Sequence, residues 1–178
     1  MKKRLAMLVL AGAMVTSSLT GCGLKDSATV ATVAGDEIPA GLANFYARMT
    51  QAQYESMYSS YLGDNMWTTE ASEGKTYEKL VKDEVLKDLE NMYLLEDHMD
   101  DYNISLSDDE KKAIKDAAKE FSKDNDKDDK EKVSGDTEYV ERYLTLVTIK
   151  QKMTDAIEAE ADTNVTDDEA KQKAMQYV

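Results

Sequence analysis

The sequence predicts a mostly α-helical protein that has several helices and a short N-terminal β-hairpin. Two observations predict this fold class. The 178 residues include only eight glycines and one proline, the residues that most often interrupt helices. In addition, apolar residues recur three and four positions apart over long stretches, which is the spacing of one helix face.

The first residues have the features of a secretory signal. Basic residues 2–4 precede an apolar run over residues 5–15, which is too short to span a membrane. Leu19-Thr20-Gly21-Cys22 then resembles the lipobox of bacterial lipoproteins. We therefore expect residues 1–21 to be a lipoprotein signal peptide, and Cys22, the only cysteine, to carry lipid. Residues 22–27 would be a tether that holds the protein outside the cytoplasmic membrane. The alternative is an ordinary cleaved signal followed by an incidental thiol.

The charge of the mature chain excludes two classes of partner. Without the signal, the chain has 19 Lys and Arg residues and 36 Asp and Glu residues, which gives a net charge of −17. A surface of this sign repels nucleic acid and anionic lipid headgroups, so neither is an expected partner by charge alone. The remaining length suits a single domain with a real core, which we place at residues 28–165.

The first elements are expected in a simple order. Residues 28–38 form the hairpin, because β-forming side chains flank a turn at Gly35-Asp36. A first helix runs from Pro39, which suits the first helical position, to about Tyr61. Residues 63–74 form a loop. A second helix covers residues 76–101 with one apolar stripe.

The C-terminal part contains two helix-start signals. Ser107-Asp108-Asp109-Glu110 is a capping box that starts a third helix. Residues 123–132 are almost wholly charged, so we expect a mobile connection there, followed by a fourth helix over residues 137–161. Thr166-Asp167-Asp168-Glu169 repeats the capping-box pattern and starts a last helix.

This order of segments resembles the N-terminal chaperone domain of the PrsA/SurA foldases, which are extracytoplasmic proteins related to peptidyl-prolyl isomerases. The resemblance rests on the lipobox and on four further segments: residues 30–38 (VATVAGDEI), the Phe45-Tyr46 helix, residues 104–110 (ISLSDDE) and residues 139–144 (YVERYL). It implies a SurA-N-like helical domain. It also implies that residues 166–178 begin the connection to a parvulin isomerase domain, which we expect to be missing from this chain.

No catalytic or metal site is recognisable in the sequence. His98 is the only histidine and Cys22 is assigned to lipid, so no oriented acid–base pair can be identified. Whether the protein is an enzyme stays open, because the family it resembles is that of the isomerases. Residues 124–128 resemble a D-x-D-x-D calcium loop, but Asp129 stands where such a loop needs glycine. We expect no cofactor, and we interpret this run as solvated and disordered.

Aromatic and methionine side chains are concentrated in the first two helices and the loop between them. Most of them are expected to be core residues. However, the first helix carries aromatic residues on more than one face, and Met and Tyr suit a surface that accepts many clients. The candidate client-binding residues are Phe45, Tyr46, Met49, Tyr54, Met57, Tyr58, Tyr61 and Trp67.

Three functions are compatible with these observations. The first is a membrane-anchored foldase or chaperone domain that holds exported, unfolded polypeptides without nucleotide or metal. The second is the N-terminal part of a complete peptidyl-prolyl isomerase. The third is a structural or adaptor lipoprotein that binds a single partner in the cell envelope. The range of clients separates the third function from the first, because only a general holding surface should act on several unrelated proteins.

Overall fold

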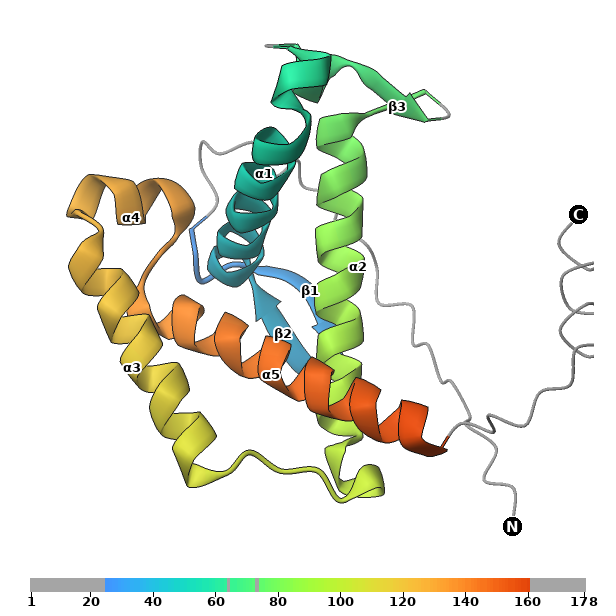
Figure 1. Cartoon of the computed structure of the whole chain (residues 1–178), viewed down its shortest axis with the longest axis vertical. Coiled ribbons are helices and arrows are strands. Elements are labelled where there is room, and N and C mark those ends of the chain that lie inside the picture. Colours follow the sequence, from blue (N-terminus) through green and yellow to red (C-terminus); the bar gives the residue numbers. More distant parts are fainter. Residues whose placement is uncertain (1–24, 64, 73, 161–178) are drawn as a thin grey trace, which may run out of the picture.

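The computed structural model describes residues 25–63, 65–72 and 74–160 (Figure 1). Within these residues the helices are α1 (Ala40–Leu62), α2 (Tyr77–Asp97), α3 (Asp108–Asp124), α4 (Lys127–Val133) and α5 (Thr137–Glu160), with 3-10 turns η1 (Met66–Thr68) and η2 (Met99–Tyr102). The strands are β1 (Thr29–Val33), β2 (Asp36–Pro39), β3 (Glu70–Ser72) and β4 (Lys75–Thr76). The mostly α-helical fold with an N-terminal hairpin is confirmed. The expected signal peptide, Cys22 and the expected last helix lie outside the described residues.

The N-terminal hairpin is built from β1 and β2, which pair antiparallel with Val33 opposite Asp36. The turn is therefore Ala34-Gly35, one residue earlier than expected. Both turn residues have positive φ, 53° and 100°, and this conformation matches the right-handed twist of a two-residue hairpin. The hairpin directs Ile38 into the core, where its side chain is fully buried.

The residues just before the hairpin belong to the fold. The backbone N–H of Gly41, at the start of α1, donates to the carbonyl oxygen of Asp26 over 2.8 Å. The Asp26 carboxylate also accepts a hydrogen bond of 3.0 Å from the hydroxyl of Ser134, and Asn44 donates to the same hydroxyl. Ser134 lies between α4 and α5, where its side chain is buried and its backbone has a left-handed conformation. The last residues of the expected tether are thus pinned to α1 and to the α4–α5 turn.

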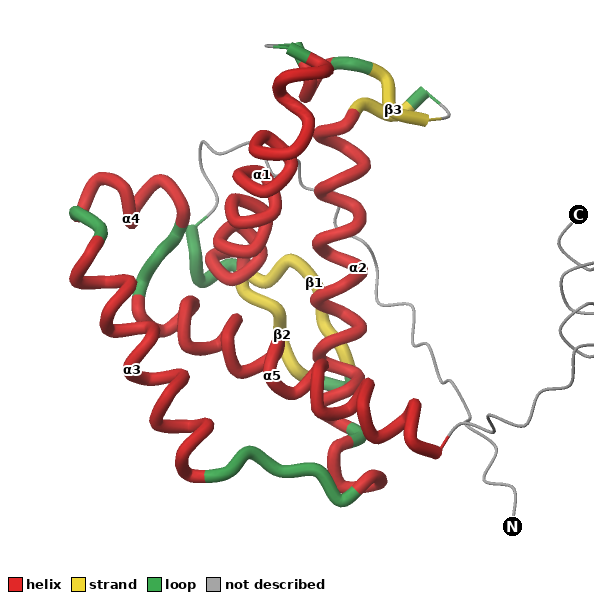
Figure 2. Tube along the Cα trace, in the orientation of Figure 1, coloured by secondary structure: helices red, strands yellow, loops and turns green. Residues whose placement is uncertain are grey.

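The main core lies where α1, α2 and α5 meet. Helices α1 and α2 run side by side in opposite directions, and α5 crosses them near the start of α1 (Figures 1 and 2). The apolar stripe of α2 is buried as expected. Helix α2 ends at Asp97, however, and residues 99–102 form a separate 3-10 turn. The buried residues of this core are Ile38, Leu42, Ala43, Val81, Val85, Leu89, Met92, Tyr93 and Leu146.

Helix α3 begins at the predicted capping box. The Ser107 side chain accepts from the N–H of Glu110, and the Glu110 carboxylate accepts from the Ser107 N–H over 2.7 Å. The Glu110 carboxylate also accepts a hydrogen bond of 2.8 Å from the ammonium group of Lys152 in α5. These three groups hold the pKa of Glu110 down at about 2, with the Lys152 hydrogen bond as the largest cause. One carboxylate thereby caps α3 and joins it to α5.

The expectation of a mobile, disordered connection at residues 123–132 is wrong. Helix α4 forms there, and the carboxylate of Asp126 caps it by accepting from the N–H of Asp129 over 2.9 Å. Lys130 donates to the carbonyl of Ser122 over 3.0 Å, and Val133 packs against the Phe45 cluster. A helix cap and an apolar contact at the last residue thus order a segment that its charge alone predicts to be solvated.

Helix α5 connects the other elements through paired side chains. Its Arg142 makes a bidentate ion pair with Glu96 of α2 at 2.6 Å and lies 4.6 Å from the ring centre of Tyr93. Tyr139 covers Gly41, where an added Cβ would lie 2.3 Å from the ring, so a larger residue cannot fit there without movement. Helix α5 is thus joined to the C-terminal part of α2 through Arg142 and packs against the start of α1 through Tyr139.

Candidate functional site

The C-terminal half of α1 carries a row of large side chains on one face. Tyr54, Met57, Tyr58 and Tyr61 are three, four and seven residues apart, which places them on a single helix face. Trp67 of η1 lies against this row, with its ring centre 6.3 Å from that of Tyr54. We call these five residues the aromatic tip, because they lie where α1 and α2 project beyond the core (Figure 1).

The aromatic tip is largely open to solvent. The exposed fractions of Met57, Tyr58 and Tyr61 are 53%, 40% and 85%, whereas Tyr54 and Trp67 are half-buried. Glu55 is the only charged residue between positions 49 and 63. Neighbouring large apolar groups on a helix surface with a single charged residue form the kind of patch that soluble proteins use to contact partners.

Hydrogen bonds and a buried methionine hold the tip in shape. The Trp67 indole N–H donates to Glu55 over 2.8 Å, and the Tyr54 hydroxyl donates to Glu84 of α2 over 3.3 Å. Met66, next to Trp67 in η1, is only 2% exposed and fixes this turn against α2. The rings of Tyr54 and Trp67 are thus held in place, and little ordering of these two rings is required on binding.

Both carboxylates at the tip are held by neutral donors. Gln51 and then Trp67 lower the pKa of Glu55 by hydrogen bonding, so Glu55 is ionised at neutral pH. Burial, and then Glu84, raise the pKa of the Tyr54 phenol, so Tyr54 stays protonated and acts as a donor. Glu55 and Glu84 are therefore ordered acceptors beside exposed rings.

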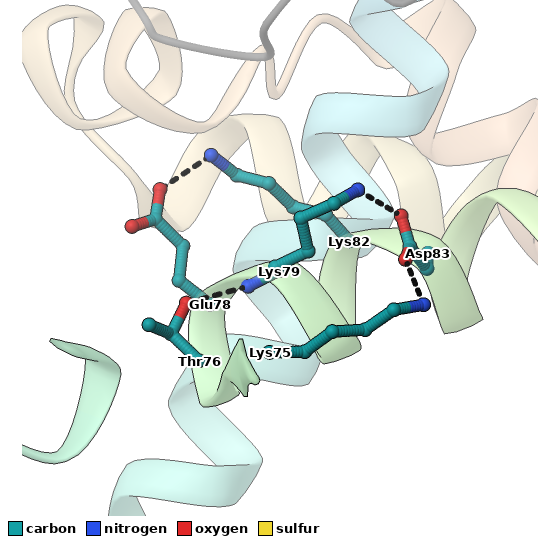
Figure 3. Close-up of polar contacts among 6 residues, drawn as sticks. All are labelled: Lys75, Thr76, Glu78, Lys79, Lys82 and Asp83. Carbon is teal, nitrogen blue, oxygen red and sulfur yellow. Dashed lines mark hydrogen bonds and ion pairs between the residues drawn. The ribbon is translucent and has the colours of Figure 1, made fainter. Parts of the chain in front are cut away.

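The lysines near the tip are already paired. At the start of α2, Lys75 and Lys79 both contact the Asp83 carboxylate, at 3.0 and 2.9 Å, and Lys82 contacts Glu78 (Figure 3). The Lys79 hydrogen bond is the main cause that lowers the pKa of Asp83. The nearby Thr76 side chain caps α2 by accepting from the N–H of Lys79.

Below the tip, the surface is hollowed on either side of Tyr46. One depression of about 320 Å³ lies between α1 and α2, and one of about 400 Å³ extends to α5. The Tyr46 hydroxyl donates to Asp88 over 2.6 Å, and Lys150 of α5 donates to the same carboxylate over 2.6 Å. Tyr143 lies beside Tyr46, with ring centres 5.0 Å apart.

The Tyr46 cluster is suited to binding and provides no activated nucleophile. Burial raises the pKa of the Tyr46 phenol well above its usual value, and the hydrogen bond to Asp88 adds to this effect. The phenol is therefore protonated at any physiological pH. It forms a fixed polar floor between two depressions with partly apolar walls, including Met92 and Val147.

The eight candidate client-binding residues occupy three environments. Tyr54, Met57, Tyr58, Tyr61 and Trp67 come together in the aromatic tip. Tyr46 forms the floor of the depressions, and Met49 is half-buried against the Phe45 cluster.

The prediction that Phe45 binds clients is corrected, because its side chain is only 3% exposed. Its ring meets Phe121 and Tyr143 edge-on, at 5.5 and 5.6 Å between ring centres, and offers almost no surface to a client. Sequence reasoning did not identify Glu84, Asp88 and Lys150. No local pattern marks them, because their partners are 30 to 62 residues away.

The described residues contain no candidate metal site. Within them, no group of three or more His, Cys, Asp or Glu side chains is arranged to hold a metal ion. His98 is exposed and contacts Asp101 over 3.0 Å. Among the described helices, none combines the length and apolar character needed to cross a membrane.

Comparisons of this chain with protein-family models, with curated proteins and with solved structures found no match.

Proposed function

We propose that this protein is a membrane-anchored, extracytoplasmic chaperone that holds exported, unfolded polypeptides on the aromatic tip. The observation that carries the proposal is the exposure of Met57, Tyr58 and Tyr61 side by side on a helix surface with one charge. Tyr and Met provide large apolar contact area, and Met adapts its shape to different partners. Such a surface supports weak binding of varied apolar segments without nucleotide, metal or catalysis.

The location follows from the N-terminal sequence. Lipid on Cys22 would anchor the chain, because each buried methylene group contributes about 0.8 kcal/mol and two or more acyl chains give stable attachment. Replacement of Cys22 by Ser should release the protein from the membrane fraction. Membrane retention equal to that of the parent would contradict the lipid anchor.

The holding function is tested by light scattering with three unrelated, chemically unfolded proteins. The protein carries Cys22→Ser so that no detergent is needed. We expect it to slow the aggregation of all three test proteins. The double variant Met57→Gln/Tyr61→Gln should lose most of this effect. The matched control is Leu94→Gln/Ile157→Gln, which changes two large hydrophobic residues that are exposed elsewhere.

The outcomes separate the two leading functions. Protection of several test proteins that depends on Met57 and Tyr61 supports a chaperone. Equal loss in both double variants would contradict a role of the tip. An absence of protection in the parent would favour an adaptor lipoprotein, whose binding is restricted to one envelope partner.

A further inference from the structure

The charges around the aromatic tip restrict which polypeptides fit it. Glu55 and Glu84 each hydrogen bond to a ring of the tip, through Trp67 and Tyr54. In the described part of the chain, neither carboxylate forms an ion pair, and their partners are the neutral groups Trp67, Gln51 and Tyr54. The uncompensated charge next to the rings is therefore negative.

The nearby cations do not neutralise these two carboxylates. Lys75, Lys79 and Lys82 are engaged by Asp83 and Glu78 (Figure 3). Arg48 lies about two turns before Glu55 on α1, and the Asp88–Lys150 pair lies farther along α2. Lys87 lies one turn after Glu84 and lines the same depression, but within the described residues it forms no ion pair with Glu84. Arg48 donates to Gln51 and has only a small effect on the pKa of Glu55.

Two further features attract cations to the same place. The tip lies at the C-terminal end of α1, where the helix dipole is negative, and the last turn of α1 has no basic residue. The faces of tyrosine and tryptophan rings also attract ammonium and guanidinium groups. Apolar contact, ring faces, carboxylates and the helix end therefore all favour one type of occupant.

We propose that the aromatic tip selects unfolded segments in which lysine or arginine lies next to apolar residues. This inference rests on the proposed function and specifies its client class. The apolar side chains would contact Met57, Tyr58 and Tyr61, while the cationic groups lie over the rings toward Glu55 and Glu84. Acidic segments of equal hydrophobicity are repelled both by these carboxylates and by the net charge of the protein.

The test uses three peptides with the same length and the same leucine and phenylalanine positions. They differ only in three residues, which are all Lys, all Gln or all Glu, and none contains tryptophan. Trp67 is the only tryptophan of the protein, so its fluorescence reports binding at the tip. The anisotropy of labelled peptides gives a second, independent measurement. We expect the Lys peptide to bind about tenfold more tightly than the Glu peptide at low salt, and this ratio to fall at high salt.

Two variants separate the local effect from the net charge. Glu55→Gln/Glu84→Gln keeps an acceptor for Trp67 and for Tyr54, and it should reduce the Lys-over-Glu ratio to about twofold or less. The control Glu120→Gln/Glu158→Gln changes the net charge by the same amount at exposed positions in α3 and α5, and it should keep the ratio.

Each outcome decides the inference. Equal affinity for the Lys and Glu peptides overturns the inference and leaves the proposed function intact, because apolar binding remains. Equal loss of selectivity in the two double variants also overturns it, since the net charge would then be the cause. If none of the three peptides binds in either measurement, the proposed function fails as well.

Discussion

Two exposed regions of this protein differ sharply in how they meet solvent. In residues 108–132, which cover α3 and all of α4 except its last residue, 18 of 25 side chains are charged. Residues 49–63, at the C-terminal end of α1, include one charged side chain. The charged helices turn a narrow face with Ile114 and Ala118 inward, and their outer faces carry ion pairs at helical spacing. The tip of α1 instead exposes rings and a thioether.

The difference shows which surface is specialised. The charged side chains on α3 and α4 are sufficient to keep the outer faces of those helices solvated. Exposed tyrosine and methionine on α1 add nothing to solubility, and they lie on well-supported geometry beside Met66 and Trp67. This exposed apolar surface is therefore the one on which our proposal of client binding rests.

The largest expected effect on stability comes from a buried residue that supports the tip, and we compare it with an exposed residue of the tip. Met66→Ala should lower the free energy of unfolding by about 2–5 kcal/mol, because it leaves a cavity beneath η1. Met57→Ala, at an exposed position on the same tip, should change it by about 0.5 kcal/mol or less. Urea unfolding followed by circular dichroism measures both. Equal losses would show that Met57 is a packing residue and would remove the contrast.

The charged region should depend on its caps. Ser107→Ala removes the side chain that accepts from the Glu110 N–H, and it should cost about 1 kcal/mol. Lys112→Ala in the middle of α3 serves as a control. A thermal melt identical to that of the parent would mean that the capping box contributes nothing to α3.

Glu110 should give the charged region a defined acid sensitivity. Its pKa is about 2 in the folded protein and near 4.5 without these partners, so its contribution to stability is fully present above pH 4.5. That contribution is lost as the pH falls from 4.5 through about 2. Glu110→Gln should flatten the fall in urea midpoint over this range. Its effect at neutral pH should be smaller than that of Ser107→Ala, because glutamine also completes a capping box. A pH profile parallel to that of the parent would contradict the link to Lys152.

Single ion pairs on the charged helices should matter least. Lys112 and Asp116 lie 2.6 Å apart but are both well exposed. Asp116→Asn should therefore change the unfolding free energy by about 0.5 kcal/mol or less. A loss above 1 kcal/mol, measured by urea unfolding at low salt, would mean that the charged face stabilises the fold as strongly as the apolar contacts do.

Local signals in the sequence were sufficient to predict most of the helices. The stripe from Val81 to Tyr93 and the box at Ser107 each depend on neighbours within one or two turns, so the structure reproduces them. Helix α4 was missed because net charge was weighed without its cap, Asp126, and its last apolar residue, Val133. Helix α4 contains a single apolar residue, so it has no apolar periodicity from which it could be predicted.

The candidate site could be predicted only in part. The sequence indicated aromatic residues on more than one face of the first helix, but spacing cannot tell which face another helix covers. Phe45 is covered because α5 crosses α1 there, and this depends on contacts with Phe121 and Tyr143 that lie far away in the sequence. The pairing of Asp88 with Lys150 likewise depends on how α2 and α5 cross.

The hydrogen bonds that pin Asp26 have a mechanical consequence. Cys22 precedes Asp26 by four residues, a reach of at most about 14 Å, whereas the 23 residues of α1 extend about 34 Å to the tip. With lipid on Cys22, traction between the membrane and a cargo at the tip would run lengthwise through α1. The hydrogen bonds from Gly41 and Ser134 to Asp26 would bear this force before it reached the β-hairpin. Force applied by a client at the tip would therefore not separate β1 from β2.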